Sequence, residues 1–196
     1  MPRLGTQLID IGKISARPRI EKDAPLVFST SLKPSLFDLS VNKKMIEKQL
    51  GTLETSQAKF FVSRAHWNLH EVVQHFASQL QKPDLYFTTW AMKEQPARAI
   101  LDMKNRVLIG KVFALISDRM PGNDKQSLQL LEPILSGSRQ LKLHAKVACL
   151  LSENEGITIL GSANWSANPR IETGVAIRDF NLTKEFANWI LNEIER

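Results

Sequence analysis

The hydrophobic pattern becomes regular from about residue 58 and predicts alternating strands and helices. Short apolar runs and period-two alternation indicate strands, whereas apolar spacings of three and four residues indicate one face of a helix. We therefore expect strands over residues 59–63, 85–90, 111–117, 141–151, 157–160 and 171–177. Helical spacing is found within residues 69–80, 97–103, 128–135 and 186–194. Strand–helix alternation followed by a hairpin predicts a layered α/β fold around a mixed sheet.

Local signals support the starts of two of these helices. Asn68, followed three residues later by Glu71, matches a capping box. Pro96 suits the first turn of the next helix, because proline is tolerated there. Residues 118–124 contain a Pro-Gly pair and are expected to form a loop.

Residues 1–50 lack this regularity, and we expect them to be an irregular, basic extension of a domain that covers residues 51–196. Nine Lys/Arg and five Asp/Glu give this segment +4 of the chain's net charge of +6. A solvated extension, a nucleic-acid-binding arm and a dimer-embracing arm all remain open for it. The charge favours polyanionic partners such as nucleic acid.

The composition fits a globular protein of a reducing compartment. An apolar content of 43% is sufficient for a buried core. The single cysteine, Cys149, cannot form an intrachain disulfide and falls in a predicted buried strand. Residues 1–20 lack the apolar core of a secretory signal, and no apolar run is long enough to span a membrane. We therefore expect a cytoplasmic protein without a membrane partner.

Candidate chemistry is concentrated between residues 141 and 177. His144 and Lys146 lie two residues apart in a predicted strand, so their side chains should share one face. Ser162 and Asn164 follow the next strand and share a side if the chain stays extended. The intervening turn is short enough for a hairpin, which would bring the four side chains together. An imidazole, an ammonium, a hydroxyl and an amide can attack and hold a phosphate group.

The sequence His144-Ala145-Lys146, followed by Gly161-Ser162-Ala163-Asn164, resembles the HxK…GSxN signature of the phospholipase D superfamily. With residues 168–172 included, it most resembles the single-motif, phage-associated members of that superfamily. The resemblance covers about a fifth of the chain. It implies an α/β/α sandwich and a phosphodiesterase that needs neither a metal nor another cofactor. Glu172 stands where many members carry a carboxylate that orients the histidine.

One position departs from the family pattern. The family usually has an aspartate five residues after the lysine, and this chain has Leu151 there. Strand alternation places residue 151 on the face opposite His144, because the two are separated by an odd number of residues. The missing carboxylate would then be a supporting group and not one that contacts phosphate.

The chemistry suggested by the resemblance requires two histidines, one as nucleophile and one as acid for the leaving oxygen. The chain contains a single HxK motif, because His66, His70 and His75 are followed two residues later by Asn, Val or Ala. A two-fold homodimer that brings two copies of His144 face to face would supply the second group. In this scheme Glu172 fixes the histidine tautomer.

Other residues have weaker signals. The spacing of His66, His70 and His75 matches no standard zinc motif, so no metal site is predicted. Trp165 directly follows the GSxN motif, where its ring would line the substrate groove and stack on a base, although most tryptophans belong to a core. Arg170 is a candidate for contact with a phosphate backbone.

These features together predict a metal-independent phosphodiesterase, a nuclease acting through a phosphohistidine at a site shared across a homodimer. Its expected substrate is nucleic acid rather than lipid, because of the positive charge, and DNA is expected rather than RNA. The catalytic residues would be His144, Lys146, Ser162, Asn164 and Glu172. Two alternatives remain open: a DNA- or phosphate-binding module that has lost turnover, and a phospholipid-processing enzyme.

Overall fold

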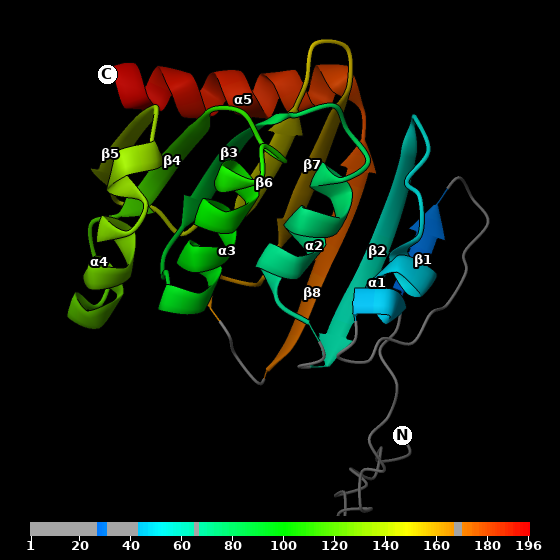
Figure 1. Cartoon of the computed structure of the whole chain (residues 1–196), viewed down its shortest axis with the longest axis horizontal. Helices are drawn as coiled ribbons and strands as arrows, with labels where there is room; N and C mark the ends of the chain where they lie inside the picture. The colour runs from blue at the N-terminus through cyan, green and yellow to red at the C-terminus, as the bar shows by residue number, and fades with distance from the viewer. Residues whose placement is uncertain (1–26, 31–42, 65–66, 167–169) are drawn as a thin grey trace, which may run out of the picture.

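The computed structural model describes residues 27–30, 43–64, 67–166 and 170–196. Eight strands form one mixed sheet in the spatial order β1-β2-β8-β7-β6-β3-β4-β5 (Figure 1). Their bounds are Val27–Thr30 (β1), Gln57–Arg64 (β2), Asp84–Thr89 (β3), Val112–Ser117 (β4), Gly137–Leu141 (β5), Val147–Leu151 (β6), Gly156–Gly161 (β7) and Ile171–Arg178 (β8). The strands β3, β4 and β5 are parallel, and the other neighbours pair antiparallel.

Helices cover both faces of this sheet. Their bounds are Lys43–Leu50 (α1), Leu69–Ala77 (α2), Glu94–Asn105 (α3), Gly122–Gln129 (α4) and Phe180–Glu195 (α5), with a short 3-10 turn at Glu132–Ile134 (η2). The first four lie in front of the sheet in Figure 1, and α5 crosses the strands β3 to β7 on the other face. The predicted layered α/β arrangement with a mixed sheet is confirmed.

Two hydrophobic cores form because alternate strand residues point to opposite faces. On the side of α1 to α4, Phe87, Leu150 and Ile159 pack with side chains such as Phe76. On the side of α5, Tyr86, Cys149 and Val147 pack with Ala187 and Ile190. Burial raises the pKa of the Cys149 thiol to about 12, so this cysteine stays protonated and fills core space.

The capping box predicted from the sequence is present at the start of α2. The backbone N–H of Asn68 donates to a carboxylate oxygen of Glu71 over 2.7 Å. Pro96 lies in the first turn of α3, as expected. The patterns in the sequence thus placed α2, α3, β2, β3, β4, β7 and β8 within a few residues of their observed bounds, and α5 begins earlier than its apolar spacing indicated, at Phe180.

Three local predictions differ from the structure. Residues 141–151 are not one strand: β5 ends at Leu141, an irregular segment covers 143–146, and β6 begins at Val147. The helix predicted over 128–135 begins earlier, at Gly122, so the end of the predicted loop 118–124 is helical. This helix gives way to η2, whose second residue is Pro133. The short strand β5 was not predicted, because Gly137–Leu141 has no apolar run.

The predicted domain boundary at residue 51 lies inside the folded unit. The strand β1 pairs antiparallel with β2 at the edge of the sheet, from Val27 opposite Phe61 to Thr30 opposite Ala58. In α1, Ile46 and Leu50 belong to the main core. Residues 1–26 and 31–42, which hold most of the predicted basic extension, lie outside the described residues.

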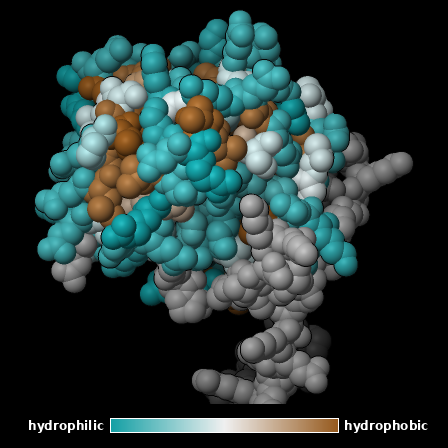
Figure 2. All heavy atoms as spheres, viewed as in Figure 1, coloured by the Kyte–Doolittle hydropathy of each residue, from teal (hydrophilic) through white to brown (hydrophobic). Residues whose placement is uncertain are grey.

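The surface is mainly hydrophilic on the face that carries α1 to α4, with apolar atoms visible between the helices (Figure 2). Larger apolar side chains are exposed on the strands β2 and β8, where Phe60 is 41% and Ile171 is 68% exposed. Of the helices that the structure describes, none combines the length and the apolar character required to cross a lipid bilayer.

Candidate active site

The residues singled out from the sequence gather at one end of the sheet. His144 and Lys146 immediately precede β6, Ser162 immediately follows β7, and Glu172 is the second residue of β8. The adjacent strand β3 ends here too, and Trp90 follows it. In open α/β sheets, the carboxyl ends of parallel strands are the usual place for a ligand.

The His144 imidazole and the Lys146 ammonium lie against each other. The Nζ atom of Lys146 is 3.3 Å from Nε2 and 3.5 Å from Nδ1 of the ring, and it donates to the His144 carbonyl over 2.9 Å. His144 is exposed and Lys146 is half-buried. Partial burial lowers the pKa of Lys146, and the nearby Glu172 carboxylate opposes that shift.

The segment that carries this pair is held by Thr88, a residue that the sequence analysis missed. Its hydroxyl donates to the Ala145 carbonyl over 2.7 Å and accepts from the Val147 N–H over 3.0 Å. These two bonds bracket Lys146, whose own carbonyl accepts from the Gly161 N–H over 3.3 Å. Thr88 is fully buried in β3, the strand that pairs with β6.

Ser162 and Glu172 form the second half of the site. The Ser162 hydroxyl donates to a carboxylate oxygen of Glu172. The same residue exchanges bonds with Thr173: its N–H donates to the Thr173 carbonyl over 2.9 Å, and its hydroxyl accepts from the Thr173 N–H over 3.0 Å. Serine and carboxylate are therefore fixed relative to each other by the pairing of β7 with β8.

The glycine of the GSxN motif has a packing reason. A Cβ at Gly161 would lie 2.6 Å from the Thr173 carbonyl oxygen and 3.2 Å from the Cα of Gly174. Both are backbone atoms, so no side-chain rotation would relieve the clash. Glycine at 161 allows the end of β7 to approach β8 closely enough for the Ser162 contacts.

Lys146 and Glu172 also line a hollow of about 20 Å³. That is room for about one water-sized group. Ser63 and Thr173 also line it; Ser63 pairs with Glu172 across β2 and β8 and is only 4% exposed. The two halves of the site thus border the same hollow, and Glu172 influences Lys146 through its charge.

The orienting bond expected between Glu172 and His144 is not formed. The carboxylate of Glu172 accepts from Ser162, and among the described residues the ring nitrogens of His144 have only Lys146 within hydrogen-bond distance. The carboxylate stands one strand away, because β7 lies between β6 and β8. Glu172 therefore acts on Ser162 and on the charge of Lys146 in this structure.

Asn164, Trp165 and Arg170 have different surroundings. Asn164 is half-exposed, and its amide oxygen is buried without a hydrogen-bond partner among the described residues. Arg170 is exposed just before β8. Trp165 is fully buried, with its ring 4.9 Å from that of Phe87. A buried indole has no open face for a base, so the prediction that Trp165 lines the substrate groove is wrong.

The position of Leu151 agrees with the argument from strand alternation. Leu151 packs with the core under α5, whereas Ala148 and Leu150 pack on the opposite side of the sheet. It is also the last residue of β6, so the whole length of that strand separates it from Lys146. A carboxylate at this position would not reach His144 or Lys146.

A hollow of about 310 Å³ adjoins His144 and contains residues that were not predicted. It is lined by Trp90 after β3, by residues 117–119 at the end of β4, and by residues 142–144 after β5. The rings of Trp90 and His144 are 6.4 Å apart at an angle of 59°. The rule that parallel strands present their carboxyl ends to a ligand points to the loops after β3 and β4, but only once their parallel pairing is known.

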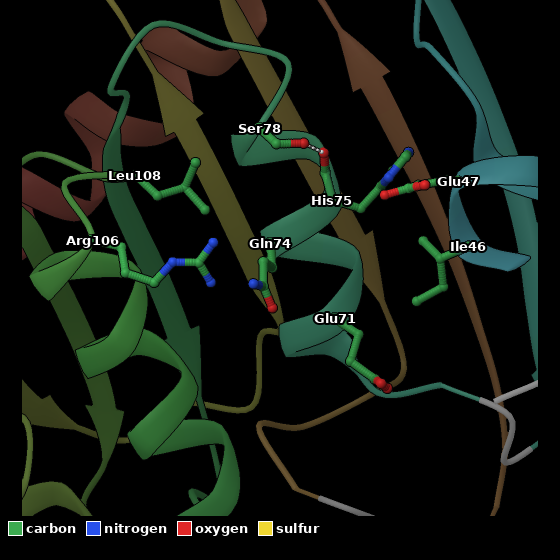
Figure 3. Close-up of a pocket in the computed structure, with 8 residues that line it drawn as sticks. All are labelled: Ile46, Glu47, Glu71, Gln74, His75, Ser78, Arg106 and Leu108. Carbon is green, nitrogen blue, oxygen red and sulfur yellow. Dashed lines mark hydrogen bonds between the residues drawn. The ribbon is translucent and has the colours of Figure 1, made fainter. Parts of the chain in front are cut away.

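Another hollow, of about 320 Å³, lies over the outer surface of α2 (Figure 3). Glu47 of α1 and His75 of α2 point toward each other there, and Arg106 extends toward Gln74. None of the motif residues lines it. Within the described part of the chain, no cluster of three or more His, Cys, Asp or Glu is arranged to hold a metal; His66 lies outside that part.

Comparison of the sequence with protein-family models gives no match, and comparison with curated proteins gives none either. The structure, in contrast, is similar to solved structures. One is a phospholipase D family member, Nuc from Salmonella typhimurium, with a TM-score of 0.50, 14% identity, and coverage of 62% of this chain and 83% of that chain. NucT from Helicobacter pylori has a TM-score of 0.53 and 19% identity, with coverage of 70% and 95%.

Polyphosphate kinase from Porphyromonas gingivalis is also similar, with a TM-score of 0.54 and 16% identity over 80% of this chain but only 29% of that chain. At these identities the likeness establishes the fold. The chain has the phospholipase D-like α/β/α fold around a mixed sheet, as its HxK and GSxN motifs implied.

Proposed function

We propose that this protein is a metal-independent phosphodiesterase that cleaves nucleic acid through a phosphohistidine at His144. The observation that carries the proposal is the exposed His144 imidazole beside the Lys146 ammonium, at the end of a phospholipase D-like sheet. The net charge of +6 favours a polyanionic substrate.

In the first step a neutral ring nitrogen of His144 attacks phosphorus, so that an N–P bond forms as the bond to the leaving oxygen breaks. Lys146, Ser162 and the Asn164 amide bind the non-bridging oxygens and stabilise the charge of the transition state. The buried Oδ1 of Asn164 leaves its Nδ2 as the donor. Glu172 holds the Ser162 hydroxyl and balances the charge of Lys146.

The leaving oxygen takes its proton from a second imidazolium, and water then hydrolyses the N–P bond with that second imidazole as base. Each chain has one HxK motif, so we propose that a second copy of the chain supplies this group at a shared two-fold site. A stable dimer would bury about 1,600 Å² or more in total.

The direct test incubates the purified protein, in EDTA, with labelled DNA, RNA and phospholipid. We expect cleavage of nucleic acid, with DNA preferred, and no loss of activity on chelation. His144→Ala should abolish cleavage by at least about a thousandfold while the fold persists, because both histidines of the shared site are removed. Binding without cleavage would identify a phosphate-binding module instead. Turnover of phospholipid alone would identify a phospholipid-processing enzyme and not a nuclease.

The shared site has a separate test. Wild-type chains mixed with an excess of His144→Ala chains should lose activity, because each mixed dimer retains one histidine. Sedimentation at the assay concentration would show whether dimers are present. A fully active monomer whose activity is unaffected by mixing would exclude the shared site and leave the chemistry of His144 to be explained within one chain.

A further inference from the structure

The hollow beside His144 has the chemistry of a nucleotide-binding subsite. It has a volume of about 310 Å³, within the usual range of ligand pockets. Its wall combines one aromatic ring, Trp90, with the cationic residues Arg119 and Lys142. We propose that it binds an unpaired nucleotide next to the scissile phosphate, so that the substrate is single-stranded nucleic acid. This inference rests on the phosphodiesterase function proposed above.

Trp90 is placed to stack a base. It is half-exposed, and its ring centroid is 6.4 Å from that of His144. A base on the Trp90 ring would therefore place its own phosphate within reach of the imidazole. Two other tryptophans, Trp67 and Trp165, are buried, and the ring of Trp189 packs against a phenylalanine of α5. Of the four, Trp90 is the one that borders both the site and solvent.

Arg119 and Lys142 supply positive charge to the same hollow. Both are exposed, and in the described part of the chain neither forms an ion pair. Asp118 also lines the hollow, so the three charged side chains sum to one net positive charge in addition to any charge on His144. That is enough to favour a phosphodiester, which carries a single negative charge at each phosphate.

The loops that form the hollow are fixed by backbone bonds. The Asp118 N–H donates to the Leu141 carbonyl over 2.9 Å, which extends the pairing of β4 with β5. The Arg119 N–H donates to the hydroxyl of Ser117 over 3.2 Å. The cationic residues therefore emerge from positions that are set before any ligand binds, which reduces the ordering cost of binding.

An aromatic side chain that stacks on a base distinguishes single-stranded from double-stranded nucleic acid. In a duplex, both faces of each base are covered by its neighbours, so the base must leave the stack before it can rest on an indole. In a single strand a base face is available, and stacking of this kind is tolerant of sequence. The hollow therefore selects the strand state of the substrate and not its sequence.

The test measures binding with the full chain in a His144→Asn background, which keeps a polar side chain in place while preventing cleavage. A labelled oligo-dT and a labelled hairpin duplex serve as ligands. Trp90→Ala should weaken oligo-dT binding about tenfold, equivalent to about 1.4 kcal/mol, and duplex binding less than about twofold. Trp90→Phe should retain most of the affinity, because phenylalanine keeps an aromatic face.

The cationic wall is tested through salt. Arg119→Ala and Lys142→Ala should each reduce the slope of log affinity against log salt by about 0.7 for the single strand. Lys184→Ala is the matched control, because this lysine is exposed on α5, across the sheet from α1 to α4. It should leave both the affinity and the slope unchanged.

The outcomes separate this inference from the proposed function. If the wild type cleaves nucleic acid but Trp90→Ala binds oligo-dT normally, or loses both ligands equally, the subsite is refuted and the function stands. If the wild type neither binds nor cleaves nucleic acid, the function itself fails. Should Trp90→Ala not fold, Trp90→Phe and an Arg119→Ala/Lys142→Ala double variant carry the test: unchanged salt slopes in the double variant would overturn the proposal.

Discussion

Replacing Thr88 by valine should separate the positioning of Lys146 from the stability of the fold. Valine has nearly the same shape as threonine, so the packing of β3 is retained while the hydroxyl is lost. The hydroxyl makes two hydrogen bonds, to the Ala145 carbonyl over 2.7 Å and from the Val147 N–H over 3.0 Å. Both backbone groups would lose their partner on either side of Lys146.

The expected cost follows from those two bonds. A typical intramolecular hydrogen bond contributes about 1 kcal/mol net, so Thr88→Val should reduce the free energy of unfolding by about 2 kcal/mol. For a chain of this length, that corresponds to a fall in Tm of about 4–8 °C. The catalytic effect should be larger: an error of about 1 Å in the position of a catalytic group can reduce the rate about a hundredfold.

A second buried threonine is a matched control. Thr158 in β7 is also fully buried, and its hydroxyl donates to Thr183 of α5 over 2.9 Å, on the sheet face opposite Lys146. Thr158→Val should lower Tm by about 2–4 °C, because it removes the bond to Thr183 and a weak 3.9 Å contact with Cys149 Sγ, but it should leave kcat near the wild-type value. Cleavage of a labelled oligonucleotide below both Tm values compares the two variants.

The comparison has a clear point of failure. If Thr88→Val and Thr158→Val show the same small change in kcat after correction for the folded fraction, Thr88 has only a structural role. Equal Tm values for Thr88→Val and the wild type would show that the two hydrogen bonds contribute nothing to stability. Either result would refute the inference that Thr88 of β3 positions the irregular segment before β6.

Three further changes have defined expectations. Gly161→Ala should lower both Tm and activity, since the new Cβ would lie 2.6 Å from a backbone oxygen of β8. Gly122→Ala, whose new Cβ would have nothing within 4 Å, should change neither. Equal Tm values for the two variants would contradict this account. Glu172→Gln should move the alkaline limb of kcat/KM to lower pH, because the carboxylate raises the pKa of Lys146 against the effect of burial; an unmoved limb would show that Lys146 does not limit activity at alkaline pH. Burial lowers the pKa of His75 below 6.5, so its contribution to stability is complete above pH 6.5 and falls at lower pH. When the pH falls from about 7.5 to about 5, the free energy of unfolding should therefore fall less for His75→Gln than for the wild type, as measured by urea unfolding at both pH values. An equal fall would assign the acid sensitivity to other groups.

The pattern of apolar residues was sufficient for the elements with a strong local period. Residues 59–63 and 111–117 are short apolar runs, and the C-terminal pattern repeats every three or four positions, so β2, β4 and α5 could be predicted. The motif residues were also found from the sequence, since their identity and spacing are local properties. The alternation argument placed Leu151 on the correct face for the same reason.

The short elements without a period were not predictable in this way. β5 has no apolar run, and it forms because β4 offers a free edge on one side. β1 likewise exists through its pairing with β2, more than 25 residues further along the chain. The apolar residues of segment 143–146 suggest a strand, but the segment is irregular: the Thr88 hydroxyl bonds to the Ala145 carbonyl, and the Lys146 carbonyl accepts from the Gly161 N–H.

The chain's local chemistry therefore settles which residues can react, and strand order settles which of them meet. β7 stands between β6 and β8, so Glu172 bonds to Ser162 and not to His144. The parallel order of β3 and β4 brings Trp90 and Arg119 to the same hollow, although 29 positions separate them in the sequence. Such meetings depend on long-range pairing and on which faces are buried, and no local pattern encodes either of these.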